Sequence, residues 1–193
     1  AFDRRVDTRY AQRTLHHPTT SATVAALHRA ALRPDRASSG IAVFFSSYAY
    51  AEAIREETRR IAPDLRIALQ PRRRELGAQA AWIECALTEG GALFLVLGSS
   101  FAESVDLLGG RISHAMVVGP ALPEVNPVQE ARLREWESRN HAQAFHHVYQ
   151  LPGMIKVNQA LGRLVRAPNQ HARVLLHCHR FTEPSYRELL APE

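Results

Sequence analysis

The sequence predicts an α/β fold with a mostly parallel sheet that helices cover on both faces. Apolar runs such as Ile41–Phe45 and Ala92–Leu97 are continuous rather than alternating, which is typical of strands buried on both faces. Longer segments with apolar residues at helical spacing lie between these runs. Because strands that alternate with helices pair in parallel through crossover connections, the 193 residues should form one such domain.

Five strands are expected, each bounded by turns or polar loops. In an open parallel sheet, ligands bind at the carboxyl ends of the strands. The loops that follow Phe45 and Leu97, and the one that precedes Pro120, should therefore meet at one edge. The expected strands are Ile41–Phe45, Leu65–Leu69, Ala92–Leu97, Ile112–Val118 and His171–Cys178.

Helices are expected between these strands and at both ends of the domain. Residues 1–37 are interpreted as an N-terminal segment that packs on a domain of residues 38–193. Pro63 and Pro168 each end a helical segment, because proline cannot continue a helix. The expected helices are Ser21–Leu32, Tyr48–Ile61, Arg74–Thr88, a polar helix at Val128–Tyr149, a helix around Gln159 and a short one at Pro184–Leu190.

Composition excludes several classes of protein. No apolar run approaches the roughly 20 residues of a membrane span, so no membrane partner is expected. Cys85 and Cys178 are too few for a disulfide framework, which favours a reducing cytoplasm, and Cys85 is expected in the core of an apolar helix. The net charge of +5 favours a polyanionic partner. Lys156 is the only lysine and has no P-loop context, so any nucleotide site would be supplied only in part.

The segment Gln159–Arg166 carries the most informative pattern. Gln159, Arg163 and Arg166 follow spacings of four and three residues, which place them on one helical face. Gly162 on that segment lets another group approach closely. Planar guanidinium groups suit phosphate oxygens. The alternative interpretation is a solvated basic face.

Three motifs in a fixed order extend this pattern. Val43–Tyr48 reads Val-Phe-Phe-Ser-Ser-Tyr, a polar loop over Gly98–Gly109 follows the expected strand Ala92–Leu97, and Gln159–Arg166 precedes the last strand. In this order they resemble motifs IV, V and VI of the second RecA-like motor domain of superfamily 2 helicases of the DinG/XPD (Rad3-like) type. The resemblance covers about residues 38–193 and extends to the CRISPR-associated DinG-like group, so a CRISPR ribonucleoprotein complex is one possible partner.

The resemblance implies a role in ATP hydrolysis. ATP with Mg²⁺ would be bound mainly by a first motor domain of the same polypeptide, so this chain alone should be inactive and is expected to be part of a longer one. Gln159, Arg163 and Arg166 would face the phosphates, with the two arginines as finger candidates. An iron–sulfur cluster is possible elsewhere in the full-length chain. Glu103, Asp106 and Gly162 would couple the nucleotide state to the grip on DNA.

The resemblance also implies contacts to single-stranded DNA. Hydroxyl groups can hydrogen-bond phosphates, and an aromatic ring can stack on a base. The implied contact residues are Ser46, Ser47, Tyr48, Ser99 and Ser100.

Two alternatives stay open. Ser104 stands where the helicase family favours glycine, and Gln170 where it favours an acid, so the chain could be a non-catalytic RecA-like module that binds nucleic acid or a partner. His177 and His179 are spaced so that they could share a metal ion. The interpretation that we adopt for these histidines is a strand and loop pair with no metal.

Overall fold

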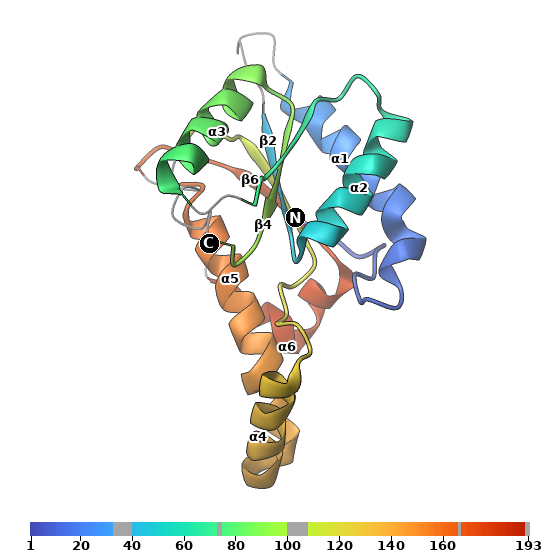
Figure 1. The fold of residues 1–193 in the computed structure, drawn as a ribbon, viewed down its shortest axis with the longest axis vertical. Helices are drawn as coiled ribbons and strands as arrows, with labels where there is room; N and C mark the ends of the chain where they lie inside the picture. Colours follow the sequence, from blue (N-terminus) through green and yellow to red (C-terminus); the bar gives the residue numbers. More distant parts are fainter. Residues whose placement is uncertain (33–39, 73–74, 100–107, 166, 192–193) are drawn as a thin grey trace.

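The predicted α/β fold with a parallel sheet is confirmed. The structure, a computed structural model, describes residues 1–32, 40–72, 75–99, 108–165 and 167–191. Within these residues six strands form one sheet in the order β1-β6-β5-β2-β4-β3, and every pair is parallel (Figure 1). The strands are β1 (Phe2–Asp3), β2 (Ile41–Phe45), β3 (Ile67–Leu69), β4 (Ala92–Val96), β5 (His114–Val118) and β6 (Arg173–His177).

The central strand β2 shows how the two faces are filled. Ile41, Val43 and Phe45 point to one face, where they pack with residues of α1 (His17–Ala31) and α2 (Tyr48–Ile61). Ala42 and Phe44 point to the other, where they pack with α3 (Leu76–Glu89) and α5 (Leu151–Gly162). Because both faces are covered, all five residues of β2 are buried, as a continuous apolar run predicts. Cys85 is exposed on α3, so its expected place in the core is wrong.

The expected single helix over Val128–Tyr149 is also wrong. The chain forms α4 (Pro127–Phe145), but Asn140 has extended backbone angles of φ −156° and ψ 92°, which break the helix. The chain reverses there, since Trp136 stacks on His147 with 4.0 Å between ring centroids. This helical hairpin extends away from the sheet (Figure 1). Its second arm continues through the π-helical turn η4 (His146–Gln150) into α5, which therefore begins eight residues before Gln159.

The remaining helical elements are short. They are the 3-10 turns η1 (Arg13–His16) and η5 (His179–Thr182) and the final helix α6 (Pro184–Arg187). None of the helices in the described ranges is both long and apolar enough to cross a membrane.

The N-terminal segment is part of the sheet, which the sequence did not predict. β1 pairs with β6, and the buried His177 on β6 joins it to α1. The ring of His177 lies 2.9 Å from Asp3 Oδ2 through Nδ1 and 3.0 Å from Thr20 Oγ1 through Nε2. Because an ionised carboxylate only accepts, Nδ1 donates to Asp3 and the Thr20 hydroxyl donates to Nε2. His177 thus holds structure together rather than a metal ion.

This buried histidine makes the fold sensitive to acid. Burial lowers the pKa of His177 to about 4, against 6.5 in the unfolded chain. The unfolded state therefore binds the proton more tightly, so stability is full above pH 6.5 and is lost as the pH falls toward 4. At ~1.4 kcal/mol per unit of pKa difference, the loss is about 3 kcal/mol.

The measurement is the free energy of urea unfolding from pH 7 to pH 4, for the natural chain and for His177→Asn. Because His17 and His28, whose pKa values are also lowered by burial, titrate in both proteins, the difference between the two isolates residue 177. Equal slopes against pH would contradict a neutral, buried His177.

Candidate nucleotide and nucleic-acid interface

Helix α5 lies against the sheet with one apolar side. Val157, Ala160 and Leu164 are buried in the core that contains Phe44 and Leu95. At 100° per residue, this burial places Lys156, Gln159 and Arg163 together on the flank of the helix. The helix packing therefore fixes where the polar side chains point.

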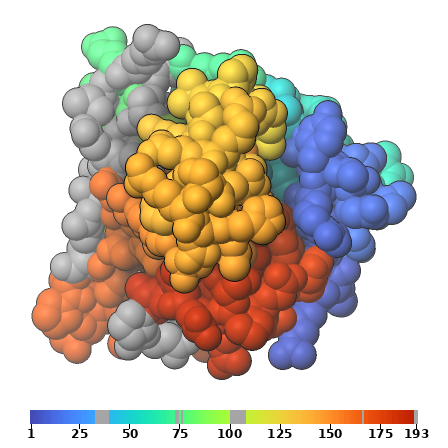
Figure 2. Space-filling view, turned by 90° about the horizontal axis from the view of Figure 1, so that it is seen from below, coloured from blue at the N-terminus to red at the C-terminus, as the bar shows by residue number. Residues whose placement is uncertain are grey.

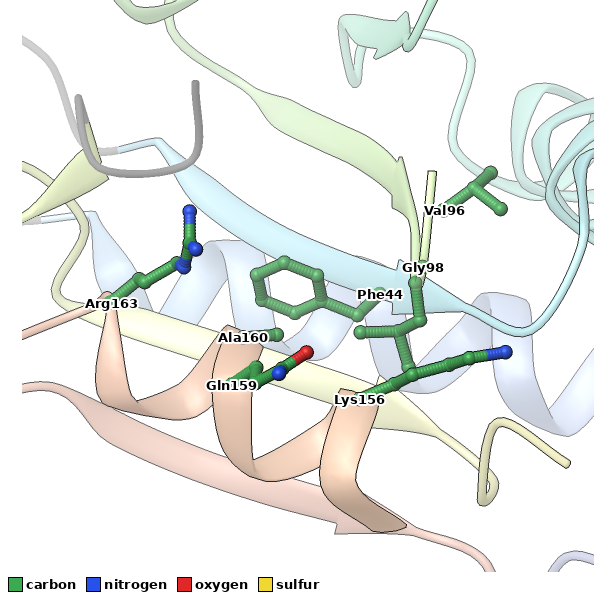
Figure 3. Close-up of a pocket in the computed structure, with 8 residues that line it drawn as sticks. Phe44, Val96, Gly98, Lys156, Gln159, Ala160 and Arg163 are labelled. Carbon is green, nitrogen blue, oxygen red and sulfur yellow. The ribbon is translucent and has the colours of Figure 1, made fainter. Parts of the chain in front are cut away.

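These three polar side chains line a small pocket at the carboxyl end of β4. Figure 3 shows Lys156 passing Gly98 at this end, Gln159 beside Phe44, and Arg163 on the other side of Phe44, toward the amino ends of the strands. The pocket has a volume of about 40 Å³, room for only one or a few water molecules. A phosphate could contact its rim, but this chain cannot enclose a nucleotide there. Gln159 and Arg163 are thus brought together as the sequence predicted.

Lys156 is a member of this group that sequence reasoning missed. It lines the pocket beside Gly98, which has φ +71°, and a Cβ at position 98 would come within 2.9 Å of the Lys156 Cδ atom. Glycine is needed there both for the backbone angle and for the close approach. The spacing of Lys156, Gln159 and Arg163, three and then four residues, could have revealed the third group.

The far end of the predicted arginine face differs from the expectation. Helix α5 ends at Gly162 with Arg163 as its C-cap, so the expected continuous helix through residue 166 is wrong. The helix stops there rather than at Pro168. A Cβ at Gly162 would meet no atom of the described residues within 4 Å, so that part of the chain leaves the space beside Gly162 open. Several predicted site residues lie outside the described residues, namely Arg166, Ser100, Glu103, Ser104 and Asp106.

Two of the predicted nucleic-acid contacts are joined by a residue that the sequence did not single out. The buried Gln70 donates through Nε2 to Tyr48 Oη and to Ser99 Oγ, both at 2.8 Å. Its Oε1 accepts from the Val96 N–H at 2.8 Å. Arg72 lies over the Tyr48 ring at 4.8 Å from the centroid. A polar cluster therefore ties the exit of β4 to the first turn of α2.

This cluster and the pocket share the exit of β4. Val96 bonds to Gln70 and lines the pocket, Gly98 lies under Lys156, and Ser99 bonds to Gln70. A shift of residues 96–99 would therefore move both the lining of the pocket and the polar cluster around Gln70. Gln70 was hard to predict from the sequence, because a single glutamine after a strand forms no recognisable motif.

Ser46 and Ser47 lie elsewhere on the same edge. Ser47 is the N-cap of α2 and accepts from the Tyr50 N–H. Both serines line a wide groove of about 720 Å³, bounded by Thr8–Arg13 on one side and by the exits of β2, β5 and β6 on the other. We call it the N-terminal groove. The predicted nucleic-acid contacts thus fall into two groups rather than one.

Comparisons with known proteins agree with this geometry. A family model described as the helicase C-terminal domain matches residues 34–192. The regulator of telomere elongation helicase 1 homolog of Caenorhabditis briggsae is 27% identical over 166 residues, covering 71% of this chain and 16% of that protein.

Solved structures show the same fold. An apo XPD structure aligns with a TM-score of 0.76 at 16% identity, covering 97% of this chain and 37% of that one. Xpd4 from S. tokodaii gives 0.69 at 15%, with 98% and 36% covered, and an XPD helicase structure gives 0.73 at 18%, with 97% and 32% covered. The chain thus spans about a third of these proteins, and about a sixth of the helicase homolog. None of these relatives supports the expected CRISPR association.

Gln70→Ala should destabilise the fold and loosen the cluster around it. The substitution leaves the Val96 N–H without its partner and removes two donors, at a cost of about 2 kcal/mol. The exposed Gln143 on the hairpin is a matched control, because Gln143→Ala should change the free energy of unfolding by less than ~0.5 kcal/mol. Equal urea-unfolding curves for the two variants would count against a structural role for Gln70.

Proposed function

Because the chain belongs to the helicase C-terminal domain family of Rad3/XPD-like superfamily 2 helicases, we propose that it is the second motor domain of an ATP-dependent DNA helicase. The whole helicase then consists of this domain and a first motor domain that binds ATP with Mg²⁺. The coverage supports this division, since the chain spans about a third of the XPD chains that share its fold.

The observation that carries the proposal is the position of Arg163. It shares a pocket with Gln159 and Lys156, and this pocket opens at the carboxyl end of β4, the edge where such folds bind ligands. In the proposal, the guanidinium of Arg163 stabilises charge that develops on the transferred phosphoryl group, and Gln159 orients the phosphate oxygens. Lys156 adds positive charge at the same rim. Arg166 keeps its predicted role as a second finger candidate.

The shallow pocket agrees with a site shared between two domains. A cavity of about 40 Å³ cannot hold a nucleotide, so the other walls must come from a second body. Closure of the two motor domains on ATP then brings Arg163 to the phosphates, and opening after hydrolysis withdraws it. Because these steps require both domains, this domain alone hydrolyses no ATP.

The DNA side of the proposal uses the remaining groups on the edge. Tyr48 offers an aromatic ring at the exit of β2, and Ser46, Ser47 and Ser99 offer hydroxyls to phosphates. We propose that Glu103 and Asp106 couple the nucleotide site to the DNA contacts. Gln70 holds the side chains of Tyr48 and Ser99 in fixed relative positions. The shared exit of β4 gives a physical route for that coupling.

Arg163→Ala in the full-length helicase should abolish most DNA-stimulated ATP hydrolysis. An arginine finger contributes about 10³-fold or more to the rate, so steady-state turnover should fall by that factor. Arg60→Ala is the control, because Arg60 is exposed in the last turn of α2, far from the carboxyl edge, and pairs only with Glu57 among the described residues. Unchanged turnover in the Arg163 variant would remove the assignment of Arg163 as a finger. A natural full-length protein that binds single-stranded DNA but hydrolyses no ATP would instead favour a non-catalytic RecA-like module.

Gly162→Ala tests whether glycine at position 162 is required by the fold of this domain or by the close approach of the partner domain. An added methyl meets no atom among the residues that the structure describes, and alanine is the better helix former, so the melting temperature should stay the same or rise. If the ATP-bearing domain packs closely on Gly162, ATP hydrolysis should nevertheless fall about tenfold.

Gly77→Ala in α3 is the matched control, because its Cβ would also lie in open space, 4.0 Å from the nearest side-chain atom. Full ATPase activity in the Gly162 variant would show that no group approaches this helix end.

A further inference from the structure

The C-terminal residues lie along the helical arm that continues into α5. Figure 2 shows the red C-terminal part of the chain packed beside the orange second arm of the hairpin. We call residues 184–191 the C-terminal segment. Tyr186 is buried in the core that also contains Val157 of α5, and Leu189 and Leu190 pack against this core. The segment is therefore a packed part of the domain.

Asn158 of α5 binds this segment at two points. Its Nδ2 donates to the carbonyl oxygen of Leu189 at 2.7 Å, and its Oδ1 accepts from the Ala191 N–H at 3.2 Å. The two bonds fix which end of the amide carries the oxygen, because a flipped amide would set donor against donor and acceptor against acceptor. Asn158 therefore uses both halves of its amide to hold the backbone of the C-terminal segment.

A second hydrogen bond joins the C-terminal segment to the residue that precedes α5. Gln150, which is buried in η4, donates from Nε2 to Ser185 Oγ at 3.2 Å. Gln150 precedes Asn158 by eight residues, which corresponds to about 12 Å along a helix. Hydrophobic burial is non-directional, whereas hydrogen bonds are limited in distance and angle. Bonds at two separated points therefore constrain the position of α5 along its own axis as well as its rotation.

Asn158 lies on the side of α5 that faces away from the pocket. At 3.6 residues per turn it is about 160° around the helix from Lys156 and about 140° from Arg163. It is not among the described residues that line the pocket with those two side chains. Asn158 nevertheless directly precedes Gln159 in the same helix. A shift of α5 after the loss of its bonds would therefore move all three polar groups of the pocket together.

We propose that Asn158 is a positioning residue for phosphoryl transfer, which holds α5 to the C-terminal segment so that Arg163 reaches the phosphate in the productive geometry. This inference rests on the proposed function, since Arg163 must be the finger. It adds a residue that touches no nucleotide and gives the C-terminal segment a role in turnover. Position matters for such a group, because a displacement of about 1 Å can lower a rate by about 10²-fold.

The test is steady-state ATP hydrolysis by the full-length helicase with saturating single-stranded DNA. Asn158→Ala should lower kcat about tenfold and change the KM for ATP by less than about twofold, because the first motor domain binds most of the ATP while the finger acts in the transition state. Asn158→Asp keeps the acceptor for Ala191 but loses the donor to Leu189. It is expected to give the same separation of kcat from KM, and it replaces the alanine variant if that protein is too unstable to assay.

Thr58→Ala is the matched control for a loss of stability. Thr58 is buried in α2 on the opposite face of the sheet, where its hydroxyl donates to the Ile54 carbonyl oxygen. The substitution should lower the melting temperature at least as much as Asn158→Ala does, but leave kcat unchanged. An equal fall in kcat in the two variants would show a general effect of stability and overturn the proposal.

A double-substitution cycle tests whether Asn158 acts through the C-terminal segment. Ala191→Pro removes the N–H that donates to Asn158 Oδ1 and should lower kcat about threefold. Because both substitutions remove the same contact, together they should lower kcat only about tenfold. A combined fall of about thirtyfold would mean that the two residues act independently, which contradicts the proposal.

The Arg163 and Asn158 variants tell the two proposals apart. If Arg163→Ala leaves turnover unchanged, the finger assignment fails, and Asn158 has no group to position. If Arg163→Ala abolishes turnover while Asn158→Ala keeps kcat within about twofold of the natural value, the finger assignment stands and only the role of Asn158 is overturned.

Discussion

The packing of α5 against the sheet is the constraint on which the active edge depends. Burial of Val157, Ala160 and Leu164 fixes the rotation of the helix, and that rotation directs Lys156, Gln159 and Arg163 into one pocket that runs from the exit of β4 along the sheet. The hairpin formed by α4 and η4 leads directly into α5 and sets where the helix begins. The backbone positions of the polar side chains at this site are thus set by the apolar contacts of their helix.

The parallel sheet brings the pocket and the N-terminal groove to the same edge. Because every strand runs in the same direction, the exits of β2, β4, β5 and β6 all open on the same side. The pocket lies over β4, and the N-terminal groove lies over β5 and β6. Gln70 spans the interval between Tyr48 and Ser99 and also bonds to the backbone of β4. The proposed motor function would require such a connection, since a change at the nucleotide must reach the strand of nucleic acid.

Sequence reasoning was strongest where hydrophobic burial decides the structure. Continuous apolar runs located β2 and β4, because strands covered on both faces leave no alternation, and shorter apolar segments located β3, β5 and β6. It missed β1, since two residues carry no periodic signal and their pairing depends on His177, far along the chain. It missed the reversal at Asn140, because an Asn in a polar helix is not unusual. Cys85 was misplaced, since its apolar helix exposes one side. Gln70 and Asn158 became visible only when distant segments met.

The most direct measurement is the affinity of the full-length helicase for ADP–aluminium fluoride with Mg²⁺, an analogue of the transferred phosphoryl group. A finger that acts in the transition state tightens binding of the analogue but not of ADP. Arg163→Ala should therefore bind ADP as the natural protein does and bind the fluoride complex at least about 100-fold more weakly. Equal affinity of the two proteins for the fluoride complex would contradict the placement of Arg163 at the reacting phosphate.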